Sequence, residues 1–242
     1  MYAIEAVSLV KRYQDVTAVD DLNLEIRRGE LFSLLGINGA GKTTTIKMLT
    51  GLAKPTAGDA LVGGYSIAEQ PEKVKSLIGV SPQETAVAPN LSVEENLALI
   101  CGIHGFSREK TGKKIQELTK LLDLGEVLRR KAGKLSGGWQ RRVSIAMALI
   151  SEPEILFLDE PTLGLDVIAR QELWDTIRGL KGRATIILTT HYMEEAQALS
   201  DRIGIMRDGR LLAVGTPEEL MEQAGINDFE GAFIAIVKEV RP

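Results

Sequence analysis

Residues 31–49, L-F-S-L-L-G-I-N-G-A-G-K-T-T-T-I-K-M-L, decide the fold of this chain. Leu31 to Leu35 has the apolar character of a buried strand, and Lys42 opens a run with the periodicity of an amphipathic helix. The loop between them is rich in glycine. The stretch therefore predicts a strand, a glycine-rich loop and a helix in direct succession.

The glycine-rich loop has the residue types that a phosphate-binding site needs. Its spacing, Gly36-x4-Gly41-Lys42-Thr43, is that of the Walker A motif. Glycine lets backbone N–H groups approach a ligand closely, and the start of the helix adds unpaired N–H groups and a positive dipole end. We expect Lys42 to contact the β- and γ-phosphates of a nucleotide and Thr43 to bind Mg²⁺; a helix-capping turn is the alternative. The predicted phosphate-binding residues are Gly36, Asn38, Gly39, Ala40, Gly41, Lys42, Thr43 and Thr44.

A second stretch, Ile155 to Glu160, ends an apolar run in two carboxylates. A fully apolar strand is typical of the centre of a parallel sheet, and ligands bind at the carboxyl ends of such strands. We therefore expect Asp159 to hold Mg²⁺, directly or through water, and Glu160 to orient or deprotonate an attacking water.

Four further candidates are weak when each is taken alone. Tyr13 has a ring face on which a purine can stack, Gln83 follows a predicted strand and can offer its amide oxygen to Mg²⁺ or to water, and His191 follows another strand, where it can hold a γ-phosphate. Ser136, Gly137 and Gly138 precede a helix and suit either a second anion site or a plain N-cap. The alternatives for the first three are ordinary surface or loop positions.

Composition and charge limit the classes of protein to consider. The 242 residues suit one or two domains, and 44% hydrophobic with 26% charged residues is ordinary for a soluble globular protein. A net charge of −4 argues against a broad nucleic-acid surface. A single cysteine excludes an internal disulfide, and we find neither a signal peptide nor an apolar run of the roughly 20 residues that a membrane span needs, so we expect a cytosolic protein.

The order of patterns along the chain predicts the fold class. Tyr2 to Val10 and Leu22 to Ile26 alternate as antiparallel strands, with Tyr13 in the link between them, whereas Thr85 to Ile150 is helical. We predict an α/β fold with a mostly parallel sheet, an N-terminal antiparallel β-subdomain and an α-helical insert. Together with the Walker A spacing, this order resembles a P-loop NTPase (RecA-like) core. A final helix is expected to pack on the sheet through Phe229, Phe233, Ile236, Val237 and Val240.

Other polar residues receive structural interpretations. The basic triplet at 129–131 and the basic pair at 141–142 are expected to lie on solvated helix faces. Cys101 and His104 are expected to be core or surface residues, because no partner ligands have the spacing of a metal site.

The ordered set of motifs resembles, over nearly the full chain, the nucleotide-binding subunit of an ATP-binding cassette (ABC) transporter. In this resemblance Tyr13 corresponds to the adenine-stacking A-loop, Gln83 to the Q-loop, Leu135 to Gly138 to the signature motif, Gly164 to Asp166 to the D-loop and His191 to the switch histidine. The phosphate loop and the Ile155 to Glu160 strand correspond to the Walker A and Walker B motifs. Trp139 departs from the signature, where glutamine is more usual.

The resemblance implies a head-to-tail dimer of nucleotide-binding subunits, most simply a homodimer. Two ATP molecules would lie between the phosphate loop of one copy and Ser136 to Gly138 of the other, with Asp166 near them. It also implies a transmembrane permease as partner, a peripheral location on the cytoplasmic face of the membrane, and no role for nucleic acid. Residues 85–150 would form the helical signature subdomain, and 1–84 with 151–242 the ATP-binding core.

Two stretches resemble the branch that exports drugs, lipids or polysaccharides: Thr162 to Asp166 and Thr190 to Ala196. The alternative is a soluble ABC ATPase that acts on the ribosome or DNA, although such relatives usually carry two cassettes in one chain or a long coiled coil. A catalytically dead regulatory cassette is disfavoured by Lys42, Asp159, Glu160 and His191.

Overall fold

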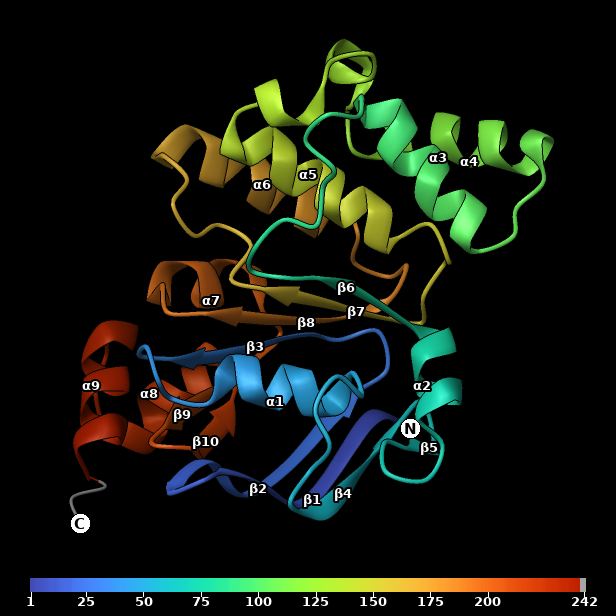
Figure 1. Cartoon of the computed structure of the whole chain (residues 1–242). Coiled ribbons are helices and arrows are strands. Elements are labelled where there is room, and N and C mark those ends of the chain that lie inside the picture. The colour runs from blue at the N-terminus through green and yellow to red at the C-terminus, as the bar shows by residue number, and fades with distance from the viewer. Residues whose placement is uncertain (240–242) are drawn as a thin grey trace.

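A six-stranded sheet forms the centre of the molecule in the computed structural model, which describes residues 1–239 (Figure 1). Its strands are β3 (Leu31–Gly36), β6 (Ile78–Ser81), β7 (Ile155–Asp159), β8 (Thr185–Thr190), β9 (Arg202–Arg207) and β10 (Arg210–Gly215). They run in the order β10-β9-β3-β8-β7-β6, and only β10 is antiparallel to its neighbour. The predicted mostly parallel sheet is confirmed. The antiparallel pair β9 and β10 is a hairpin that turns at Asp208-Gly209.

A second, antiparallel sheet contains the N-terminus. Its strands are β1 (Tyr2–Tyr13), β2 (Val16–Arg27), β4 (Ala57–Val62) and β5 (Tyr65–Ser66), in the order β2-β1-β4-β5. The predicted antiparallel β-subdomain is confirmed. One detail was wrong: Tyr13 is not in the link but is the last residue of β1, paired with Val16.

The helices connect and cover the two sheets. They are α1 (Lys42–Leu49), α2 (Pro71–Leu77), α3 (Val93–Ile103), α4 (Arg108–Leu121), α5 (Gly137–Ala148), α6 (Val167–Arg178), α7 (Met193–Leu199), α8 (Pro217–Ala224) and α9 (Phe229–Glu239), with 3₁₀ turns at Gly125–Val127 and Ala132–Lys134. Ser92 and Glu95 form the capping box that starts α3. None of the helices within residues 1–239 combines the length and the apolar character needed to cross a membrane.

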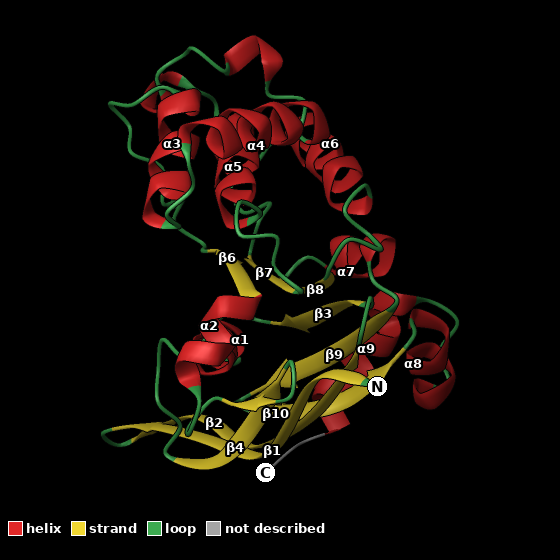
Figure 2. Ribbon diagram, turned by 90° about the vertical axis from the view of Figure 1, so that its right-hand side faces the viewer, coloured by secondary structure: helices red, strands yellow, loops and turns green. Residues whose placement is uncertain are grey.

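Both faces of the central sheet are buried, as expected for a parallel sheet. Alternate residues of β7 face opposite ways: Leu156 and Leu158 pack with α3 to α6, whereas Ile155 and Phe157 pack with α1 and the antiparallel sheet. Figure 2 shows the resulting layers, with α3 to α6 on one side of the central strands and α1 with the second sheet on the other. The layers leave the carboxyl ends of the parallel strands, where ligands bind in such folds, at one edge of the sheet.

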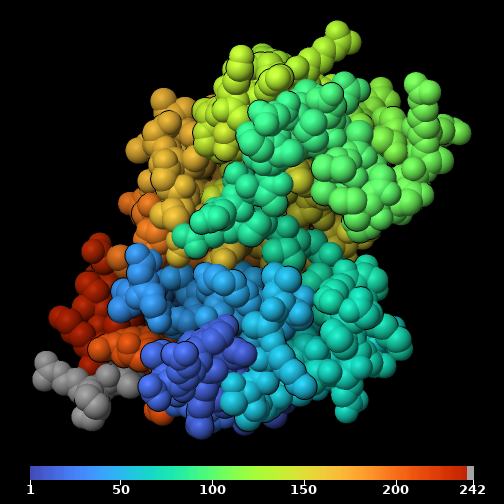
Figure 3. Space-filling view, viewed as in Figure 1, coloured from blue at the N-terminus to red at the C-terminus, as the bar shows by residue number. Residues whose placement is uncertain are grey.

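The helices α3, α4 and α5 form a lobe above the rest of the molecule, which the space-filling view shows in green and yellow (Figure 3). Helix α6 packs against α5, so the lobe is joined to the part of the chain that follows β7. The helical character predicted for 85–150 is confirmed.

The last helix packs as predicted. Phe229, Phe233 and Ile236 of α9 are buried in a cluster that includes Ile203 and Ile205 of β9. Val240, which we expected on the same face, lies outside the described residues.

Candidate functional site

The phosphate loop lies between β3, every residue of which is buried, and α1. Gly41 is the N-cap of α1 and has φ 101°, a conformation that favours glycine, and no side chain caps the helix. A Cβ on Gly36 would lie 2.4 Å from the carbonyl oxygen of Met206, and one on Gly41 would lie 2.5 Å from that of Ala18. Both glycines are therefore required by close backbone contacts, and the helix N–H groups remain available to an anion.

Lys42, the first residue of α1, is almost completely buried at 4% exposure. Its Nζ donates to the carbonyl oxygens of Gly36 (2.8 Å) and Ile37 (3.2 Å) and lies 3.4 Å from Oε1 of Glu160. Burial lowers the pKa of Lys42, while the carboxylates of Glu160 and Asp159 raise it. The ammonium is thus held inside the loop, beside the carboxylate of Glu160, the predicted catalytic base.

Asp159 ends β7 directly opposite the start of α1. Its Oδ1 accepts hydrogen bonds from the hydroxyl groups of Thr43 (3.1 Å) and Thr189 (2.5 Å). A carboxylate and a hydroxyl side by side are the hard oxygen donors that Mg²⁺ takes, and this ion usually uses only one or two carboxylates together with water and phosphate oxygens. The residues fit such an ion, although no cluster of three or more His, Cys, Asp or Glu with metal-binding geometry occurs within residues 1–239.

Glu160 lies between the lysine and the histidine that the sequence singled out. It is 8% exposed; Oε1 faces Lys42, and Oε2 lies 3.5 Å from Nδ1 of His191. Its φ of 45° is in the left-handed region, which is unfavourable for a residue with a Cβ. Its N–H donates to the carbonyl oxygen and the hydroxyl of Thr189, at 3.1 and 3.0 Å. The neighbouring strand therefore holds Glu160 in a strained conformation.

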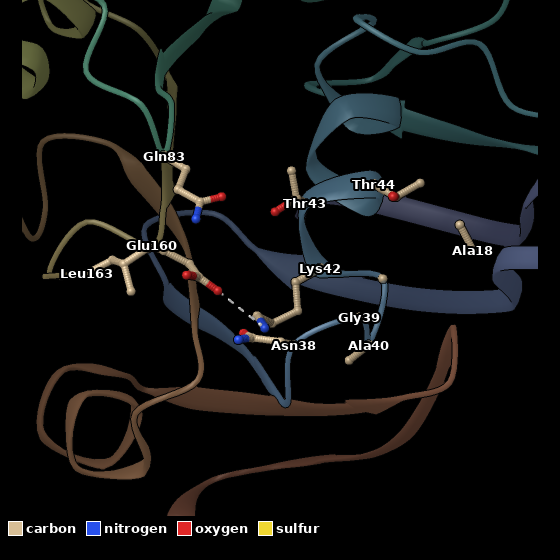
Figure 4. A pocket seen from close by; sticks show the side chains of 11 residues that line it. Ala18, Asn38, Gly39, Ala40, Lys42, Thr43, Thr44, Gln83, Glu160 and Leu163 are labelled. Carbon is tan, nitrogen blue, oxygen red and sulfur yellow. Dashed lines mark ion pairs between the residues drawn. The ribbon is translucent and has the colours of Figure 1, made fainter. Parts of the chain in front are cut away.

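These side chains open into a cavity of about 470 Å³, seen from close by in Figure 4. Gln83 and Thr43 face each other across it, with Glu160 and Lys42 below. The lining residues are Ala18, Asn38, Gly39, Ala40, Gly41, Lys42, Thr43, Thr44, Gln83, Glu160 and Leu163.

The remaining predicted site residues do not line this cavity: Gly36, Asp159, His191, Tyr13, Asp166 and Ser136 to Gly138. Asp159 and His191 adjoin it through their contacts with Thr43 and Glu160. Tyr13, at the end of β1, is 46% exposed, and the ammonium of Lys11 lies 4.8 Å from the centre of its ring. Asp166 accepts a hydrogen bond from the N–H of Ala169 at 2.9 Å and so caps α6.

The glycine pair of the signature belongs to the helical lobe and does not line the cavity. Ser136 is the N-cap of α5, but its side chain makes no capping hydrogen bond. A Cβ on Gly137 or Gly138 would lie 3.3 Å from Leu165 or Ala169, which places this helix start beside the beginning of α6. The chain therefore brings together Lys42, Thr43, Asp159, Glu160, His191 and Gln83, but not the signature.

The structure corrects the interpretation of Arg141 and Arg142, which are buried at 6% and 8% exposure rather than solvated. Arg141 donates to the carbonyl oxygens of Pro82 (2.6 Å) and Gln83 (2.8 Å), and Arg142 pairs with Glu172. Burial lowers the pKa of Arg141. Helix α5 is thus tied to the backbone that carries Gln83, a contact that nothing in the local sequence pattern indicated.

Sequence reasoning also missed Thr189, whose hydroxyl bridges Asp159 and the N–H of Glu160. Only its position near the end of a buried strand, next to the strand with the acid pair, could have suggested a role.

The fold and the site together define a P-loop ATPase. The ABC transporter family model matches residues 19–163, which run from β2 to the turn after Glu160. The chain belongs to the ABC transporter family.

Relatives of known sequence agree with this membership. The probable multidrug ABC transporter ATP-binding protein YbhF of Escherichia coli is 38% identical over 98% of this chain. The doxorubicin resistance ATP-binding protein DrrA of Mycobacterium tuberculosis is 44% identical over 87%, and the daunorubicin resistance ATP-binding protein DrrA3 of Streptomyces coeruleorubidus is 41% identical over 92%. The chain spans 42% of the length of YbhF, 64% of DrrA and 71% of DrrA3.

Solved structures show the same architecture. An ATP-binding subunit of an ABC transporter superposes with a TM-score of 0.84 at 30% identity, covering 97% of this chain and 99% of that one. The ATP-binding cassette MJ0796, solved as a dimer in a post-hydrolysis state with ADP and Pi, superposes with a TM-score of 0.79 at 27% identity, covering 88% and 98%.

Proposed function

We propose that this chain binds and hydrolyses ATP to drive export through a separate transmembrane permease, on the cytoplasmic face of the membrane. In this proposal residues 85–150 form the signature subdomain, and 1–84 with 151–242 form the ATP-binding core. The names of the drug-resistance relatives support a drug-like cargo. A polytopic membrane protein encoded beside this chain would support the separate permease.

The residues around the cavity have distinct proposed roles in hydrolysis. The N–H groups of the phosphate loop and Lys42 hold the β- and γ-phosphates. Glu160 orients a water and accepts its proton, and His191, 3.5 Å from Glu160, holds the γ-phosphate. Mg²⁺ bound by Thr43 and Asp159, with Gln83 nearby, would neutralise charge on the phosphate oxygens.

One observation supports a dimer: the two parts of the proposed nucleotide site lie apart within a single chain. The cavity is lined by the phosphate loop, Lys42 and Glu160. The helix start at Ser136 to Gly138 lies in the lobe instead, and the Ser136 side chain makes no capping hydrogen bond there. A second copy turned head to tail would place this positive helix end over the phosphate loop of the first. The dimeric MJ0796 cassette supports such an arrangement.

Disulfide crosslinking tests this arrangement. We expect the double variant Asn38→Cys, Ser136→Cys to form a covalent dimer under mild oxidation with ATP, because the head-to-tail arrangement would bring the two positions to within the roughly 7 Å between Cα atoms that a disulfide spans. The native Cys101 is completely buried and would not compete. The control pairs Ser136→Cys with Leu52→Cys, which is 69% exposed beyond the far end of α1. If the first pair crosslinks no better than the control, the head-to-tail dimer is wrong.

Tyr13 provides a test of the adenine position. We expect Tyr13→Ala to weaken ATP binding by about 1–3 kcal/mol, because one ring face lies against Lys11 and the other is available for stacking on a base. Isothermal titration measures the change. Tyr13→Phe, which keeps the ring, should bind as the wild type does; equal affinity of the alanine variant would place the base elsewhere.

A further inference from the structure

Glu195, on α7, is a completely buried carboxyl group that does not line the ATP cavity. Glutamate is almost never fully buried unless it is paired. Glu195 has no salt bridge, and its Oε2 has no hydrogen-bond partner within residues 1–239. Burial raises its pKa, while the hydroxyl groups of Thr190 and Thr162 and the indole of Trp174 lower it. Packing alone gives no reason for an acid at this position.

The other oxygen of this carboxyl group joins two separate segments. Oε1 accepts hydrogen bonds from the hydroxyl of Thr162 at 2.7 Å and from Nε1 of Trp174 at 3.0 Å. Thr162 is 1% exposed and Trp174 is 9% exposed, so water does not compete for these bonds. One acceptor therefore satisfies two buried donors that are distant in sequence.

The segments that Glu195 joins carry, or lie beside, residues of the proposed ATP site. Thr162 belongs to the turn that starts at Glu160, where the N–H of Leu163 donates to the carbonyl oxygen of Glu160 at 3.2 Å. Trp174 is on α6, whose start lies beside the signature glycines. Glu195 itself lies in the first turn of the helix that follows His191. The carboxyl group thus ties together the segments that position Glu160, His191 and the signature.

We propose that Glu195 is a positioning residue for ATP hydrolysis, which holds the turn after Glu160 against the helix after His191 through its bonds to Thr162 and Trp174. This inference rests on the proposed ATPase function. Within residues 1–239 Glu195 makes no hydrogen bond or ion pair with the phosphate loop or α1, and its hydrogen bonds go to Thr162 and Trp174. We therefore expect it to act on the alignment of Glu160 and His191 rather than on ATP affinity. A misplacement of about 1 Å at such a site slows the chemical step by up to about a hundredfold.

The test compares steady-state ATPase kinetics, ATP affinity and melting temperature for matched variants. Glu195→Ala leaves the hydroxyl of Thr162 and the N–H of Trp174 without an acceptor, so we expect kcat to fall by at least about tenfold while ATP affinity stays within about threefold of wild type. Glu195→Gln keeps an amide oxygen as acceptor, so it should restore most of kcat. The control is Leu199→Ala, which removes a buried side chain, 2% exposed, from the same helix and should lower the melting temperature with little change in kcat.

Thr162→Val provides a second route, in case Glu195→Ala does not fold. It removes one hydrogen bond with little change in volume, so kcat should fall again without a change in ATP affinity. A kcat close to wild type for Thr162→Val and for Glu195→Ala, where this variant folds, overturns the proposal. It is equally overturned if Leu199→Ala lowers kcat as much as these variants at a similar melting temperature. Absence of ATPase activity in the wild type, with ATP bound, would instead contradict the proposed function.

Discussion

Replacing Glu160 with glutamine is expected to trap an ATP-bound dimer and to lower turnover by about 10²- to 10⁴-fold. The side chain is 8% exposed and lies between Lys42 (3.4 Å) and His191 (3.5 Å). Glutamine has the same size and can still form hydrogen bonds in this narrow place, but it cannot accept a proton from water. Binding therefore survives while hydrolysis, which would release the dimer, is blocked. Light scattering with and without ATP measures the dimer.

Glu154→Gln is the matched control for this experiment. It makes the same chemical change at a side chain that is 49% exposed and pairs with Arg28 on the surface. We expect this variant to hydrolyse ATP and to dimerise as the wild type does. If Glu160→Gln remains a monomer in saturating ATP, or turns ATP over at the wild-type rate, then Glu160 does not have the proposed role.

Lys42→Ala is expected to abolish measurable ATP binding. The variant loses the ammonium that would contact the β- and γ-phosphates, and charge-assisted hydrogen bonds contribute about 1.5–3 kcal/mol each. It also leaves Glu160 buried without its lysine, which places an uncompensated negative charge beside the phosphate site. The two effects act in the same direction, so we expect affinity to fall by at least about a hundredfold. A titration with a fluorescent ATP analogue measures it.

Lys47→Ala is the control for the lysine, because Lys47 lies on the same helix and is exposed. It should bind ATP as the wild type does. A melting curve of Lys42→Ala shows whether the variant is folded, since Lys42 also donates to the carbonyl oxygens of Gly36 and Ile37. A folded Lys42→Ala variant with unchanged affinity would refute our assignment of the phosphate site.

Much of the fold, the phosphate loop and the acid pair could be predicted because each corresponds to a contiguous sequence pattern. The glycines and Lys42 of the phosphate loop form one contiguous motif with a fixed spacing, so they are visible in the sequence. The backbone contacts of Gly36 with Met206 and of Gly41 with Ala18 appear only in the structure. The apolar strand that ends in Asp159 and Glu160 is likewise a contiguous pattern, and the parallel sheet then places those acids at the same edge as the loop.

Contacts between distant segments could not be predicted in this way. Arg141 looked like a solvated helix residue, yet it is buried against the carbonyl oxygens of Pro82 and Gln83. In the sequence, Glu195 was only part of the stretch Thr190 to Ala196 that resembles the family, and no role could be assigned to it. Its hydrogen bonds to Thr162 and Trp174 depend on how α6 and α7 pack. Neither set of partners has a fixed spacing along the chain.

The sequence by itself determined the class of chemistry, because a phosphate cradle and a terminal acid pair are built from neighbouring residues whose types and spacing are dictated by backbone geometry. The tertiary structure alone decided which side chains meet. It places Glu160 between Lys42 and His191 and the signature away from the cavity of its own chain. It also joins the turn after Glu160 to α6 through the buried carboxyl group of Glu195. The physical reason is that side-chain contacts within the core arise from the packing of helices on a sheet, which brings together residues at separations that no local pattern encodes.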